Sequence, residues 1–179
     1  NDALLDASRF VGGGEECGVH FYRARQAERR GQYDVARSEH EQCAALAIKD
    51  EEKYASLHGL SRVCRYLGRF SESLSCALMA HNIAPTRPEA IADALLVSLE
   101  TGDPERAAGW YARLQRVPSS GAVSVEYNAY EVELWPHVAI SNAYRIAGRL
   151  DEAVATARRA VRFAAYDVQA KRALELAEA

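Results

Sequence analysis

Two cysteines and two histidines near the start of the chain have the types and spacing of zinc ligands. Cys17 and His20 are three residues apart, and so are His40 and Cys43. Thiolate and imidazole groups in this number hold structural zinc. If two antiparallel helices meet around Gly31, all four side chains face one another. Ordinary packing between two such helices also explains the arrangement, and we expect no metal ion here.

Several arginines in helix-like segments are spaced to bind an anion. Pairs that lie three or four residues apart share one face of a helix. The resulting cationic track would consist of Arg25, Arg29, Arg62, Arg65 and Arg145. Guanidinium groups suit two-pronged capture of a carboxylate or phosphate. The alternative is a solvated face whose charge is compensated by acids such as Glu28.

Motifs of common catalytic sites are missing from the sequence. There is no Gly-rich phosphate loop followed by Lys, no Gly-x-Ser-x-Gly turn and no His-Glu-x-x-His helix. Asp151 and Glu152 begin a predicted helix, where the helix dipole favours acidic residues. We therefore expect no catalysis by this chain alone and no cofactor.

Composition excludes several classes of protein. The 179 residues are 49% hydrophobic and 26% charged with a net charge of -3, which indicates an ordered chain without general attraction for nucleic acid. Apolar runs fall far short of the roughly 20 residues that span a bilayer. We expect a cytoplasmic protein with reduced thiols in its core. The cysteines in question are Cys17, Cys43, Cys64 and Cys76.

A repeated pattern predicts the elements that position these residues. "GQYDVA", "GRFSES", "GDPERA" and "GRLDEA" begin at Gly31, Gly68, Gly102 and Gly148, with intervals of 37, 34 and 46 residues. A period near 34 is typical of a helix-turn-helix repeat. Each glycine would end a first helix. Five positions later a small residue would let the second helix approach: Ala36, Ser73, Ala107 and Ala153.

This pattern resembles the tetratricopeptide repeat (TPR) family. The resemblance predicts an all-α fold, a right-handed superhelical array of about four TPR-like helix-turn-helix repeats with a C-terminal capping helix. We expect an N-terminal segment with a Gly-rich junction at 1–15 and the array at 16–166. We place an insertion in the array at about 117–136 and the capping helix at 167–179.

First helices line the concave face of TPR arrays, so the resemblance implies a partner-binding groove there. The candidate groove residues are Phe21, Arg25, Arg29, His58, Arg62, Arg65, Tyr66, Asn142 and Arg145. Of these, only Asn142 is similar to the carboxylate clamp of chaperone-binding members. The insertion adds Tyr127, Tyr130 and Trp135, which either bind a partner or close the wedge between the third and fourth repeats.

Within the repeat family, the chain is similar to the helical region that follows the catalytic domain of bacterial and phage glycosyltransferases. The similar stretches are "FYRARQAERRGQYDVARSEHEQC", "YLGRFSESLSCALMAHNIAPTRPEAIADALL" and "WPHVAISNAYRIAGRLDEAVATARRAV". This resemblance implies an accessory domain whose catalytic domain, dependent on a nucleotide sugar, is absent from these residues. Whether a longer parent protein is such an enzyme stays open.

Our leading hypothesis is a non-catalytic scaffold that binds a protein or peptide, with an acidic partner as one option, or a neighbouring domain. The accessory domain of a glycosyltransferase is the alternative. Self-association through Leu4, Leu5 and Phe10 is a third hypothesis, so a homo-oligomer stays open.

Overall fold

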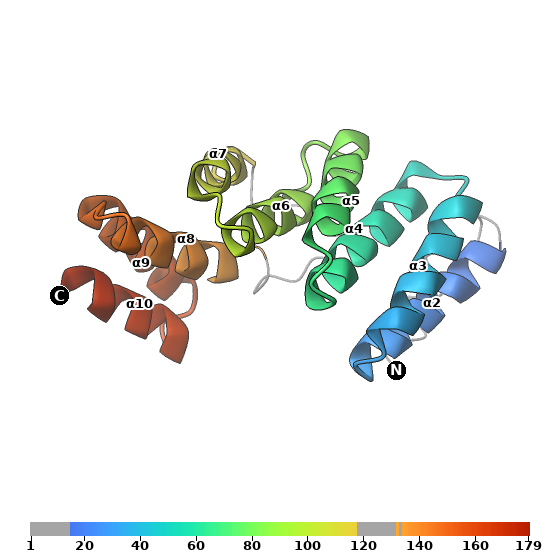
Figure 1. The fold of residues 1–179 in the computed structure, drawn as a ribbon, viewed down its shortest axis with the longest axis horizontal. Helices are drawn as coiled ribbons and strands as arrows, with labels where there is room; N and C mark the ends of the chain where they lie inside the picture. Colours follow the sequence, from blue (N-terminus) through green and yellow to red (C-terminus); the bar gives the residue numbers. More distant parts are fainter. Residues whose placement is uncertain (1–14, 118–131, 133) are drawn as a thin grey trace.

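The computed structural model describes residues 15–117, 132 and 134–179 (Figure 1). Predictions for the N-terminal segment, including Leu4, Leu5 and Phe10, lie outside the described residues, as do those for Tyr127 and Tyr130. Most of the predicted insertion lies outside them as well. The limits predicted for the domains stay a prediction.

The described residues form helices and no strand, which confirms the all-α fold class. Successive helices pair into hairpins that follow one another in an extended row, from the blue α2 and α3 to the red α10 (Figure 1). The helices are α2 Glu15–Arg29, α3 Tyr33–Leu46, α4 Asp50–Tyr66, α5 Phe70–Ile83, α6 Pro88–Glu100, α7 Pro104–Leu114, α8 Trp135–Ile146, α9 Leu150–Phe163 and α10 Val168–Glu178.

Each hairpin turns at one of the four predicted glycines. Gly31, Gly68, Gly102 and Gly148 have φ of 70 to 75°, a backbone conformation that costs other residues energy. Beyond Gly31, the Gln32 N–H donates to the Ala27 carbonyl at 2.9 Å and closes the end of α2. The three later turns repeat this pattern of hydrogen bonds. The glycines therefore set where each helix pair reverses.

Small residues in the second helices allow close packing, as predicted. Ala36, Ser73, Ala107 and Ala153 are all fully buried. Prolines occupy the first turns of α6, α7 and α8, where a missing N–H removes no hydrogen bond. Asp103 caps α7 through the Arg106 N–H at 3.0 Å. Residue types that can be recognised in the sequence thus mark where these helices begin and where two helices pack closely.

The described core is divided among the interfaces of the row. Separate apolar clusters join α2 with α3 and α4, α4 with α5 and α6, and α6 with α7 and α8. The first helices also pack side by side, α4 against α6 and α6 against α8. Such nearest-neighbour packing is the hallmark of a repeat array. The described chain is an array of TPR-like hairpins, in agreement with the predicted fold class.

Helix α10 packs against the last hairpin as the predicted capping helix. Asp167 accepts hydrogen bonds from the N–H groups of Gln169 and Ala170 at 2.9 and 3.0 Å, which fixes the start of the helix. Ala170, Ala173 and Ala177 are buried against the last hairpin. Val168, the first residue of α10, is 72% exposed.

Candidate partner-binding groove

Side chains from three first helices surround one cavity of about 550 Å³. We call it the first-helix cavity. It is lined by Arg65 and Tyr66 of α4, Asp93 and Leu96 of α6, and Trp135, Val138, Ala139 and Asn142 of α8. The structure thus brings together three of the predicted groove residues, Arg65, Tyr66 and Asn142. Trp135 joins them from the first turn of α8, which corrects its predicted place in the inserted loop. They come from helices that are separated by one complete repeat.

The first-helix cavity combines aromatic, apolar and polar groups. Tyr66 is 53% exposed and Trp135 is 39% exposed, so both rings are accessible. The Arg65 guanidinium pairs with Glu100 at 3.2 Å, from α4 to α6. The described lining residues include no Ser, Cys, Lys or His. The accessible part of the wall thus combines two aromatic rings with a guanidinium and an amide, groups that can contact a ligand.

Three other predicted residues are buried between helices. Phe21 belongs to the apolar cluster of α2, α3 and α4, and its ring meets the His40 ring edge-on, with the centroids 5.8 Å apart. His58 Nε2 lies 3.4 Å from Asp93 Oδ2 of α6. Arg62 is 4% exposed. These residues stabilise the interfaces of the array and are not accessible to a partner from solvent.

Glu28 is the centre of a buried charged network between the first two hairpins. Its carboxylate accepts from Arg62 Nη2 at 2.6 Å, and it lies 2.8 Å from His40 Nε2. Arg25 Nη1 donates to the same carboxylate at 3.3 Å. Burial alone would raise the pKa of Glu28, but the His40 hydrogen bond and the charges of Arg62 and Arg25 outweigh it and lower the pKa to about 2.

A second polar contact joins α4 and α6. Tyr54 Oη donates to Glu89 at 3.0 Å, and both side chains are buried. Burial, followed by the negative charge of Glu89, raises the pKa of Tyr54, so the phenol keeps its proton. The Arg87 guanidinium lies 4.5 Å from the centre of the Tyr54 ring. The contact links the second hairpin to the third.

The remaining predicted arginines lie along the first helices on either side of the cavity. Arg29 is exposed in the last turn of α2, whereas Arg25 of α2 and Arg145 of α8 are half-buried. Arg62, which lies between Arg25 and Arg65 in the sequence, forms a buried ion pair with Glu28. The five guanidiniums therefore differ in accessibility, although their spacing in sequence is similar.

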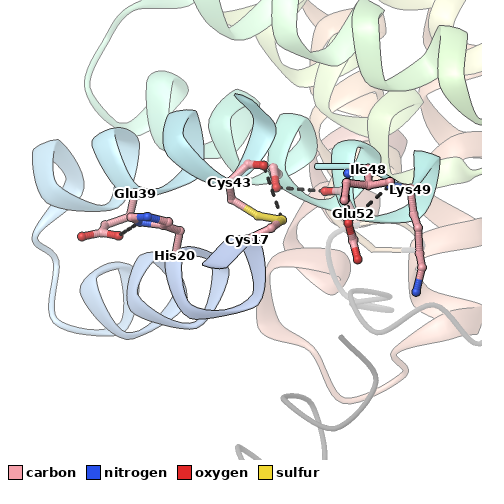
Figure 2. Close-up of a disulfide and its surroundings, with 8 residues drawn as sticks. Cys17, His20, Glu39, Cys43, Ile48, Lys49 and Glu52 are labelled. Atoms are coloured by element: carbon pink, nitrogen blue, oxygen red, sulfur yellow. Dashed lines mark hydrogen bonds and ion pairs between the residues drawn. A yellow bond between two sulfur atoms is a disulfide. The ribbon is translucent and has the colours of Figure 1, made fainter. Parts of the chain in front are cut away.

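The Cys and His residues of the first hairpin make three separate contacts instead of one tetrahedral cluster. Cys17 of α2 and Cys43 of α3 form a disulfide, while His20 lies 2.6 Å from Glu39 (Figure 2). His40 faces Glu28. Within residues 15–117, 132 and 134–179, no group of three or more His, Cys, Asp or Glu side chains is placed to hold a metal ion.

The disulfide corrects the expectation that all four cysteines are reduced thiols. Cys17 and Cys43 face each other across the first hairpin. The close packing that favours small residues at these positions also brings the two sulfur atoms near enough to form a disulfide. Cys64 and Cys76 are free. Burial raises the pKa of Cys64, and burial together with the nearby Cys64 raises the pKa of Cys76 to about 12. Both stay protonated at neutral pH and are poor nucleophiles.

Sequence reasoning missed the apolar half of the first-helix cavity. Leu96 lies six residues before Gly102, as Arg62 lies six before Gly68 and Asn142 six before Gly148. This offset is shared with Asn142, but it also selects Arg62, which is buried and does not line the cavity. Asp93, three residues earlier on α6, is 5% exposed. An acidic residue so well buried has no separate signal in the sequence.

Comparison with known proteins supports the fold. No protein-family model matches the chain, and no curated protein matches it. Among solved structures, it is similar to a thermophilic TPR protein from Thermus thermophilus, with a TM-score of 0.66 and 17% identity. The match covers 98% of this chain and 88% of that chain. At this identity the likeness shows a TPR-like fold and assigns no site.

None of the helices within residues 15–117 and 134–179 combines the length and the apolar character that crossing a bilayer requires.

Proposed function

We propose that this chain is a non-catalytic scaffold that binds a segment of a partner protein in the first-helix cavity. The observation that carries the proposal is the convergence of Arg65, Tyr66, Trp135 and Asn142 on one cavity of about 550 Å³. Two exposed aromatic rings supply apolar contact area at low entropic cost, and the guanidinium and amide supply directional hydrogen bonds.

The chemistry of the wall suggests the kind of partner. Arg65 is half-buried and shares its charge with Glu100, so an incoming carboxylate competes for an ordered guanidinium. Leu96 and Val138 provide an apolar surface beside it. A peptide with an aromatic or aliphatic side chain next to an acidic group fits these features. Arg25, Arg29 and Arg145 extend the basic character along the first helices, toward both ends of the array.

Selection from a random peptide library displayed on phage tests this proposal. We expect enriched peptides whose binding weakens at least about tenfold in Arg65→Ala and Trp135→Ala, as for residues at the centre of an interface. Arg172→Ala, an exposed change on α10, is the matched control and leaves binding unchanged. Enriched peptides that bind both cavity variants like the unaltered protein would contradict the proposal, and so would the absence of enrichment.

The alternative of a glycosyltransferase accessory domain gains no support from the comparisons, and it stays a prediction. The complete reading frame tests it, because strands alternating with helices and an Asp-x-Asp upstream would favour that alternative. A cytoplasmic location likewise stays a prediction.

A further inference from the structure

Second helices of the middle repeats enclose another cavity, on the other helical layer of the array. Its volume is about 470 Å³. We call it the second-helix groove. It is lined by Leu74 and Leu78 of α5 and by Arg106, Gly109, Trp110 and Arg113 of α7. None of these residues lines the first-helix cavity, so the two sites are distinct.

An aromatic ring forms the apolar part of the second-helix groove. Trp110 is 9% exposed, and its ring meets the edge of His81 with the centroids 5.7 Å apart. The Arg113 guanidinium lies 4.6 Å from the Trp110 ring centre. Leu78, across from it on α5, is 38% exposed. The ring is therefore held in place while apolar surface beside it stays accessible.

Gly109 keeps the groove open. It lies inside α7, where glycine lowers helix stability relative to alanine. Its backbone is not among the left-handed glycines of the described chain, and a Cβ added there would meet no atom within 4 Å. Neither backbone geometry nor packing within the described chain requires a glycine at this position. What its missing side chain provides is space in the groove.

Both charged residues of the groove are arginines. Arg106 and Arg113 are seven residues apart on α7 and flank Gly109 and Trp110 on one helix face, about 10 Å apart along the axis. Both are exposed, and none of the described lining residues is acidic. Arg106 pairs with Asp103 at the start of the helix at 3.2 Å. The groove thus has an apolar floor between two cationic ends.

We propose that the second-helix groove binds an acidic amphipathic helix of a partner protein. A bulky aliphatic side chain of that helix lies against Trp110 in the space beside Gly109. Carboxylates one turn before and one turn after that side chain are about 10 Å apart, the separation of Arg106 and Arg113. This surface goes beyond the function proposed above, because it can be occupied while the first-helix cavity is empty.

The two tryptophans of the chain allow each site to be observed alone. Trp110 lies in the second-helix groove and Trp135 in the first-helix cavity, and the sequence contains only these two. The Trp135→Phe variant of the full chain therefore reports on the groove through Trp110 emission. The probe is a capped helix-forming peptide with a central Leu and a Glu one turn on either side of it. We expect a saturable change in emission that weakens with added salt.

Matched peptides and variants define the outcome. Replacing the central Leu by Ser, or both Glu by Lys, should raise the dissociation constant at least about tenfold. The same loss is expected for Gly109→Leu, which puts a bulky side chain into the groove from a position where a Cβ meets no atom within 4 Å, and for Arg106→Glu. Arg172→Glu on α10 should not change binding. Circular dichroism of each variant verifies that the helices are intact.

Three results would overturn this proposal. They are no saturable change in Trp110 emission, equal binding of the Lys peptide, and equal binding by Gly109→Leu. The Trp110→Phe variant, which reports through Trp135, separates the two proposals. A response there alone would assign the peptide to the first-helix cavity, which removes the second-helix site and leaves the proposed function standing.

Discussion

The two ends of the array pack the same helical frame with different chemistry. At the N-terminal end, Glu28 contacts the buried His40 and Arg62, and a disulfide links α2 to α3 within the first hairpin. Between the last hairpin and α10, the buried side chains are mostly alanines, with Leu134 and Val138. The same repeat position, nine residues after the turn glycine, holds His40 in the first hairpin and Ala157 in the last.

This difference determines how much free energy each interface loses when its helices shift relative to one another. A shift in the first interface would leave Arg62 buried without a carboxylate, at a cost of about 3–5 kcal/mol. A shift in the last would cost only apolar contacts, those of the alanines and of Leu134 and Val138. The first interface therefore tolerates fewer arrangements than the last. Substitutions can therefore test whether stability and register are concentrated at the N-terminal end.

The largest effect is expected for Glu28→Ala. It removes the carboxylate that compensates the buried Arg62, so the free energy of unfolding should fall by about 3–5 kcal/mol. Chemical denaturation followed by circular dichroism measures the change. Glu175→Ala, an exposed acidic residue on α10, is the control and should change stability little. Equal losses in both variants would remove the contrast between the two ends.

Reduction of the disulfide should have a slightly smaller effect. Cys17 and Cys43 are 26 residues apart, and release of a crosslink of that span costs about 3–4 kcal/mol in the chain-entropy view. Unfolding is measured with and without a thiol reductant. The Cys17→Ser/Cys43→Ser double variant should match the reduced protein and ignore the reductant. A wild type that is insensitive to reductant would show that the crosslink contributes nothing.

Acid should weaken the N-terminal end through Glu28. Its pKa of about 2 in the folded chain lies below the ordinary 4.5, so the unfolded chain takes up a proton first as the pH falls. The stabilisation is complete above pH 4.5 and is lost toward pH 2, about 3 kcal/mol in all. In denaturation at a series of pH values, the difference between wild type and Glu28→Gln should shrink through this window. A constant difference would contradict the assignment.

Gly59→Ala should disturb the packing of the same interface. A Cβ at Gly59 would clash with the fully buried His40 ring, because it would lie closer to the ring atoms than van der Waals contact allows. We expect a loss of about 1–3 kcal/mol in thermal or chemical unfolding. Gly109→Ala is the control, because its Cβ meets nothing, and it should stabilise the protein by about 0.5–1 kcal/mol. Similar effects of the two alanines would argue against the close fit of His40.

The smallest effect is expected at the C-terminal end. Asp167→Ala removes the cap of α10 and should cost about 1 kcal/mol. Hydrogen exchange should show faster opening of α10, with the earlier hairpins unchanged. Arg172→Ala on the same helix is the control. If Asp167→Ala accelerated exchange in α2 and α3 as well, the ends would not be independent.

The hairpins could be predicted from sequence because their signals are local. A left-handed turn selects glycine, and a close helix crossing selects a small residue five positions later, whatever lies in the next repeat. Glu28 was named as a compensating acid, but on a solvated face. The burial of the pair it forms with Arg62 could not be predicted, since the two residues are 34 positions apart in different hairpins. The spacing of Arg62 matches that of the more accessible arginines, so the sequence alone does not distinguish it from them.

The candidate cavity was predicted in part for the same reason. Arg65 and Asn142 were found because polar residues on a first helix stand out from the apolar pattern. Leu96 did not stand out, because a leucine in a helix fits a core position as well as a cavity wall. The disulfide was missed because Cys17 and Cys43 also satisfy the pattern of small packing residues. Residue type alone does not distinguish these roles.

The charged contacts between neighbouring hairpins have a consequence for how such a protein can change by recombination. Glu28 with Arg62, Arg37 with Glu72, and Arg65 with Glu100 join residues 34 or 35 positions apart. Excising the second hairpin would place Leu96 where Arg62 now lies, and Glu28 would lose its arginine partner. Removing, adding or exchanging one hairpin would therefore separate charged partners on both sides of the change.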